Sequence, residues 1–163
     1  MKSSELLEEI KISIQEYDIG KIKAKLEDDE INPISKQVSI FNLKNYDEIM
    51  AKTIEKKSDE EISNEEIESM KNEIDLFFKG CSPDSEESFK KFIESICLYL
   101  SLIAKKPLHP VGIDFGDEDT VHEEIRDNET VYICDKKEFF KNQSKDYCTC
   151  NYCVCEWEWL KKI

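Results

Sequence analysis

The chain lacks a long apolar run, a secretory leader and almost all arginine. Its longest apolar stretch, residues 96–104, contains Ser101 and is too short to cross a bilayer. The first five residues lead directly into an acidic amphipathic pattern, so we expect no signal peptide. Arg126 is the single arginine, and 37 acidic side chains against 23 basic ones give a net charge of -14. These absences predict a cytoplasmic protein that has no membrane segment and no nucleic-acid partner.

Glycine and proline are also scarce, with 4 of each in 163 residues. An all-β sandwich needs many tight turns, so this composition favours a helical protein. The predicted fold class is mainly α, with a helical N-terminal bundle followed by a small β-hairpin and zinc-knuckle-like C-terminal subdomain. We place the bundle at residues 1–106 and the Cys-rich metal-binding subdomain at 107–163, packed together as one compact domain.

Helical spacing of apolar residues defines the predicted bundle. The stretches are residues 6–17, 19–26, 34–54 with a break near 42–45, 67–78, and 89–103. Ser3 or Ser4 is the expected N-cap of the first helix, and Ser63 with Glu66 forms a capping box before the fourth. The charged residues 56–61 are expected to be a solvated connection or a frayed helix end. The last stretch has the strongest apolar stripe, so it is predicted to be the central helix.

Helical periodicity stops at Lys106-Pro107. Two β-like runs follow, at residues 120–126 and 129–134, and Asp127-Asn128 between them suits a hairpin turn. The rest of the chain is dominated by cysteine.

Most of the cysteines are clustered near the C-terminus: Cys134, Cys148, Cys150, Cys153 and Cys155. A disulfide framework is disfavoured without a secretory signal, and the Cys-x-Cys pairs are too close for unstrained bridges. The Cys150-x-x-Cys153 pair can instead place two thiolates on one ion, which is typical of structural zinc sites. Cys134 is the obvious third ligand. Spacing leaves the fourth open among His109, Cys148 and Cys155.

Several segments of the chain resemble a family of uncharacterised methanogen proteins, DUF2115. The similar segments are residues 98–112 (LYLSLIAKKPLHPVG), Phe115-Gly116, residues 131–134 (VYIC) and residues 150–153 (CNYC). They correspond to the family's Lys-Lys-Pro-Leu-His-Pro helix end, Phe-Pro-Gly-Gly turn, Tyr-Tyr-Cys-Pro strand end and Cys-x-x-Cys close. The likeness is good from Leu98 onward, whereas the helical N-terminal part matches in length and pattern alone. This chain departs from the family pattern at Asp117-Glu118 and at Asp135.

The resemblance implies a metal site formed by His109, Cys134, Cys150 and Cys153, and an archaeal methanogen source. Cys148 and Cys155 stand outside the family pattern and are expected to be spare thiolates, substitute ligands or redox-sensitive neighbours. Zinc is the expected ion, because the compact cysteine spacing of ferredoxins is absent; an iron-sulfur cluster or another soft metal is the alternative. The family carries no established activity.

The remaining candidates have simpler explanations. The acidic residues Asp114, Asp117, Glu118 and Asp119 lack EF-hand spacing and are expected to be a solvated loop. His122 lies in an alternating strand pattern and is expected to face solvent, whereas Cys97 is expected to be a small core residue and Cys81 to be unimportant. Trp157 and Trp159 are expected to pack over the metal site or to mark a partner surface.

Two functions fit this pattern. The first is a non-enzymatic structural or interaction module, in which zinc locks the C-terminal subdomain and presents a surface to a protein partner. The alternative is a metalloenzyme or thiol-redox protein that uses the same Cys-rich site. No His-Glu-x-x-His or similar catalytic motif supports the alternative. The partner, the cellular process and the oligomeric state are left open by the sequence.

Overall fold

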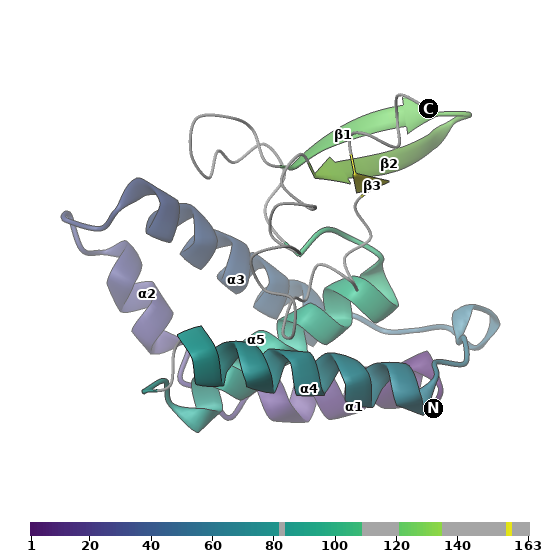
Figure 1. Ribbon diagram of the computed structural model, residues 1–163, viewed down its shortest axis with the longest axis horizontal. Helices are drawn as coiled ribbons and strands as arrows, with labels where there is room; N and C mark the ends of the chain where they lie inside the picture. The colour runs from purple at the N-terminus through teal and green to yellow at the C-terminus, as the bar shows by residue number, and fades with distance from the viewer. Residues whose placement is uncertain (82–83, 109–120, 135–155, 158–163) are drawn as a thin grey trace.

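The computed structural model describes residues 1–81, 84–108, 121–134 and 156–157. It describes the backbone alone at seven of these positions: Ile34, Cys81, Val121, His122, Cys134, Glu156 and Trp157. The helices are α1 (Ser3–Ile14), α2 (Gly20–Leu26), α3 (Pro33–Ala51), α4 (Asn64–Cys81) and α5 (Glu87–Leu98), with a 3-10 turn η1 (Lys56–Ser58) and a π-helical segment η2 (Tyr99–Ala104). The strands are β1 (Val121–Arg126), β2 (Glu129–Cys134) and β3 (Glu156–Trp157). The predicted mainly helical fold with a C-terminal hairpin is confirmed (Figure 1).

Helix α5 and its extension η2 form the centre of the bundle. Helices α1, α3 and α4 all contact α5, and α1 also contacts η2. The buried faces follow the apolar spacing of the sequence: Leu6, Leu7, Ile10 and Ile14 on α1, and Ile67, Met70, Ile74 and Phe78 on α4 are all buried. The prediction that residues 89–103 form the central helix is therefore confirmed. No helix in the described part of the chain is long and apolar enough to cross a membrane.

An aromatic cluster joins two helices and the turn after α1. Phe92 on α5 has no exposed surface, and its ring centroid lies 5.3 Å from Tyr17, 6.4 Å from Tyr46 and 6.4 Å from Phe89. Tyr17 and Phe89 also meet each other at 5.2 Å. Rings at these separations pack at favourable tilted or offset angles. Phe92 is thus the point at which α3, α5 and the end of α1 are held together.

The predicted break in the third helix is wrong. Helix α3 runs without interruption from Pro33 to Ala51, and Pro33 occupies its first position, where a missing N–H costs nothing. Residues 42–45 contain neither glycine nor proline, and asparagine lowers helix propensity only slightly. Continuity places Asn45 and Glu48 one turn apart on the same face.

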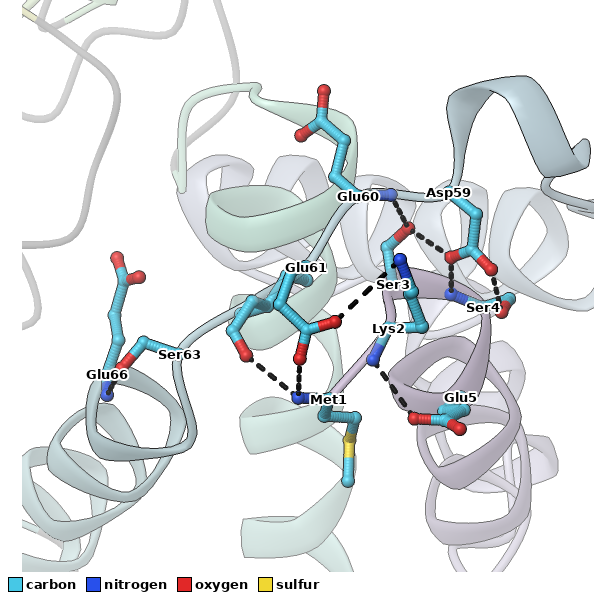
Figure 2. Close-up of polar contacts among 11 residues, drawn as sticks. Met1, Lys2, Ser3, Ser4, Glu5, Asp59, Glu60, Glu61, Ser63 and Glu66 are labelled. Carbon is cyan, nitrogen blue, oxygen red and sulfur yellow. Dashed lines mark hydrogen bonds and ion pairs between the residues drawn. The ribbon is translucent and has the colours of Figure 1, made fainter.

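The start of α1 is capped from a distance and not by its own serines. The Asp59 carboxylate accepts hydrogen bonds from Ser3 Oγ at 3.0 Å, from Ser4 N–H at 2.8 Å and from Ser4 Oγ at 2.6 Å (Figure 2). The expectation that Ser3 or Ser4 is the N-cap is therefore wrong: both lie inside the helix, and Lys2 is the N-cap. One of the two hydrogen bonds of the predicted Ser63–Glu66 capping box is present at the start of α4, where Ser63 Oγ accepts from the Glu66 N–H at 3.4 Å.

The charged connection between α3 and α4 is more than a solvated linker. Beside Asp59, the Met1 ammonium donates to Glu61 Oε1 at 2.7 Å and to the Ile62 carbonyl at 3.1 Å (Figure 2). Lys2 and Glu61 also form an isolated antiparallel bridge. These contacts fasten the start of α1 to the segment that leads into α4, and thereby close the bundle at one end.

The C-terminal sheet has the strand order β1-β2-β3. Strands β1 and β2 pair antiparallel around Asp127 (φ 51°) and Asn128 (φ 67°), as the sequence predicts. Positive φ at both central residues belongs to the tight hairpin turn that matches strand twist, and Asp and Asn tolerate it well. Strand β3 pairs parallel with β2, which the sequence pattern does not predict.

Candidate metal centre

The predicted ligands are divided between the described residues and the rest of the chain. Cys134 ends β2, whereas His109, Cys150 and Cys153 lie outside the described residues, as do the two substitute ligands Cys148 and Cys155. What the structure describes is the chain on either side of them. Leu108 precedes His109 directly, and Glu156 follows Cys155 directly.

Strand β3 joins the two ends of the cysteine-rich segment. Ile133 pairs with Glu156, and Cys134 pairs with Trp157. Neighbouring strands lie about 4.8 Å apart, so the Cys134 backbone lies beside a residue that follows Cys155 by two positions. Covalent connectivity keeps the Cys153 Cα within about 11 Å of the Glu156 Cα. The backbone on either side of residues 135–155 is therefore paired, and Cys134 is the residue directly before that segment.

The segment that leads to His109 is anchored in the bundle. Lys105 caps η2 in the left-handed conformation (φ 55°), and the Lys106 N–H donates to the Leu100 carbonyl at 2.9 Å. Pro107 is buried, and Leu108 packs half-buried against the hydrophobic core. The residue immediately before the predicted imidazole ligand is thus fixed to the helices.

A polar group on α3 supports this anchor. Lys106 Nζ donates to Glu48 Oε1 at 3.0 Å, and the Glu48 side chain is one-third exposed. Tyr99 on η2 is fully buried. Its pKa is raised to about 12, mainly by this burial and secondly by the negative charge of Glu48. Glu48 lies near enough to the buried Tyr99 hydroxyl to raise the pKa of Tyr99 both through its charge and through side-chain hydrogen bonding. The Glu48 carboxylate therefore faces both a buried phenol and the lysine that precedes Pro107.

The sequence pattern does not single out Glu48, Tyr99 or Lys106. A break in α3 would separate Asn45 from Glu48, so the prediction of that break gives no reason to place the two on one face. The apolar stripe of residues 89–103 does not predict the change from α- to π-helix at Tyr99. π-Helical turns are uncommon and frequently lie at functional sites. The one available signal is the Lys105-Lys106-Pro107 run, because it belongs to the family-like motif.

The other candidates contribute no metal cluster to the described part of the chain. Among the described residues, no three His, Cys, Asp or Glu side chains are grouped as ligands. The acidic residues 114–119 lie outside them. Cys97 is half-buried and packs on the core, in keeping with its expected role, and the His122 backbone pairs with Ile133 in the hairpin. Trp159 also lies outside the described residues.

The described residues define a small, mainly helical protein with a C-terminal hairpin, whose second strand pairs in parallel with a short strand that follows the cysteine-rich segment. A family model described as an uncharacterized protein conserved in archaea (DUF2115) matches residues 2–158, and the chain belongs to this family. The resemblance found in the C-terminal part therefore extends over nearly the whole chain.

The relatives are methanogen proteins that carry no assigned activity in their names. A UPF0305 protein of Methanocaldococcus jannaschii is 32% identical over 166 residues, which cover 96% of each chain. A UPF0305 protein of Methanococcus maripaludis (strain C5) is 31% identical over 109 residues, which cover 67% of this chain and 62% of the relative. No solved structure matches the chain.

Proposed function

We propose that the protein is a zinc-binding, non-enzymatic module that presents a metal-stabilised surface to a protein partner. One Zn²⁺ is held by His109, Cys134, Cys150 and Cys153, with zinc–sulfur distances of about 2.3 Å. The observation that carries the proposal is the parallel pairing of Cys134 with Trp157. It supports the site because the strand pair brings together the backbone on either side of the segment that carries the Cys-x-x-Cys pair, and Cys134 directly precedes that segment.

Zinc would contribute much of the free energy that orders this loop. Residues 135–155 are mostly polar or charged, and such a segment buries too little apolar surface to offset its conformational entropy. The pairing of β2 with β3 already lowers the entropy cost of ordering the segment between them. A closed tetrahedral site then needs four protein ligands and leaves no position for a substrate, which favours a structural role.

The tetrahedral ligand set favours zinc over an iron-sulfur cluster, which requires four cysteines in most proteins. A reducing cytoplasm keeps the thiols available for the metal. The net charge of -14 opposes a nucleic-acid partner and leaves a protein as the proposed one.

Metal analysis of the untagged protein tests the proposal. We expect one zinc per chain by mass spectrometry after purification under reducing conditions, and loss of that zinc in Cys150→Ser. Cys97→Ala is the matched control, because Cys97 packs on the core of the bundle, and this variant should keep the metal. A zinc-replete wild-type protein that holds no metal, and whose tail thiols react equally fast with and without zinc, would refute the proposal.

Cobalt substitution separates the module from an enzyme. Four protein ligands give a tetrahedral Co²⁺ spectrum with thiolate charge-transfer bands that added azide leaves unchanged. A spectrum that changes with azide indicates an open coordination position and contradicts the structural role.

A further inference from the structure

Helix α2 is attached to the bundle by little apolar burial. It has seven residues, of which Ile22 alone is buried. Leu26 is half-buried, and the other five are exposed. An isolated helix of this length is unstable in water, so α2 persists through its contacts with the rest of the protein. Its backbone packs against α3 at one end of the bundle (Figure 1).

Two lysines of α2 reach from this helix to the aromatic cluster. Lys21 Nζ donates to Glu86 Oε1 at 2.7 Å and to Glu86 Oε2 at 3.0 Å, and it lies 5.7 Å from the centre of the Tyr17 ring. Lys25 Nζ lies 6.0 Å from the centre of the Phe89 ring. Residues four positions apart share one face of a helix, so the two ammonium groups belong to the face of α2 that is turned toward the rings.

The lysine contacts are weak, whereas the rings that they cover are firmly packed. The Lys21 side chain is 48% exposed and the Glu86 side chain is 57% exposed, so water and salt screen their ion pair. Cation–π contacts at exposed sites are also weak. Tyr17 and Phe89, in contrast, both pack against the fully buried Phe92 of α5. The weakest contacts of this region therefore lie between α2 and the two rings.

We propose that α2 is a strap that opens from the bundle as one unit and uncovers the rings of Tyr17 and Phe89, and that Lys21 and Lys25 hold it closed. A segment with little apolar burial and exposed polar contacts opens locally at a much lower free energy than the core. Opening gives up the burial of Ile22 and the lysine contacts, but it leaves the packing around Phe92 in place. Because the ion pair is screened by salt, ionic strength sets how often the strap is open. This inference does not depend on the proposed metal site.

Native-state amide exchange on the full chain, followed by NMR, measures this opening. Lys21→Gln should speed the exchange of the α2 amides by about threefold to thirtyfold, because it removes both an ion pair and a cation–π contact. Lys25→Gln removes a cation–π contact alone and should speed it by about twofold to fivefold. Lys23→Gln is the matched control, because Lys23 is an exposed lysine on another face of the same helix; it should leave these rates unchanged. The amides of α5 should keep their rates in all three variants.

Salt and chemical modification give two independent readouts. Raising NaCl from about 0.05 M to about 0.5 M should speed α2 exchange in the wild-type protein but not in Lys21→Gln. Nitration by tetranitromethane, located by peptide mass spectrometry, should be faster at Tyr17 in Lys21→Gln than in wild type, while the fully buried Tyr99 is the internal control and should react equally slowly in both.

Three results would overturn the strap. If the α2 amides exchange with the same rate and the same urea dependence as those of α5, then α2 opens only together with the whole bundle. If Lys21→Gln and Lys23→Gln speed α2 exchange equally, the ring-facing lysines do not hold it closed. If Tyr17 nitration is the same in Lys21→Gln and in wild type although α2 exchange is faster, then opening of α2 does not uncover the ring.

Discussion

Replacing Phe92 with alanine should remove a large part of the stability of the helical bundle. The ring has no exposed surface and contacts Tyr17, Tyr46 and Phe89. Truncation of a buried phenylalanine costs about 3–5 kcal/mol through lost burial and the cavity left behind. We expect a loss near the upper end of this range, because each contact with one of the three aromatic neighbours contributes about 0.5–1.5 kcal/mol beyond the burial of the ring. The free energy of unfolding of a domain of this size is only about 5–15 kcal/mol.

Urea denaturation followed by circular dichroism at 222 nm measures this loss. Phe77→Ala is the control, because Phe77 on α4 is 40% exposed and should lose less than about 1 kcal/mol. If Phe92→Ala does not fold, Phe92→Leu should still fold and lose about 1 kcal/mol. A loss below about 1 kcal/mol in Phe92→Ala, equal to that of Phe77→Ala, would refute the view that this cluster holds the bundle together.

Two further predictions concern pH. The pKa of Asp59 is held below its ordinary 3.8, first by the hydrogen bond from the Ser4 hydroxyl, so its stabilising effect is complete above that value and is lost as pH falls through the lower folded-state pKa. Asp59→Ala should therefore be less stable than wild type at neutral pH, and the two acid-unfolding curves should converge in strong acid; parallel curves would contradict the capping role. Added zinc should move the acid transition of tryptophan fluorescence to lower pH, because protons compete with zinc for the thiolates and the imidazole. A titration of initially metal-free, reduced protein that ignores zinc would count against the site.

The helices could be predicted because their signal is local. Apolar residues at helical spacing mark the buried faces of α1, α4 and α5, and the sequence also predicts the Asp127-Asn128 turn, because Asp and Asn tolerate positive φ. The predicted break in α3 does not form, although the segment contains asparagine. Its cost is a few tenths of a kcal/mol, which the packing of Ile49 and Tyr46 readily offsets.

The contacts missed from the sequence are those that join distant residues. Asp59 caps a helix that begins 56 positions earlier, and Cys134 pairs with Trp157, which lies 23 positions later in the sequence. The sequence of a short charged segment such as residues 56–61 does not reveal whether it is solvated or caps a helix, because the helix that it caps lies far away in the sequence. The candidate site depends on contacts of this kind. The sequence could therefore name candidate ligand types, but not the strand pair that holds the Cys134 backbone beside Trp157.

Removal of the metal should affect the two parts of the chain differently. The bundle buries a continuous core and is closed at the start of α1 by Asp59 and Glu61, so it has what it needs to fold alone. The hairpin buries too little to fold alone. Among its described side chains Ile133 alone is fully buried, and Ile125 is 79% exposed. A two-stranded hairpin has only marginal stability in water.

Chelation, or Cys150→Ser, should therefore preserve most of the helical circular dichroism while amide exchange in β1 and β2 becomes fast. Cys97→Ala should leave both unchanged. Loss of the whole helical signal on chelation would show that zinc supports the entire fold, and slow exchange in a metal-free hairpin would show that it supports neither part. Fast exchange confined to the hairpin is the outcome that follows from the burial of each part, because only there would the free energy of binding the proposed zinc be required for folding.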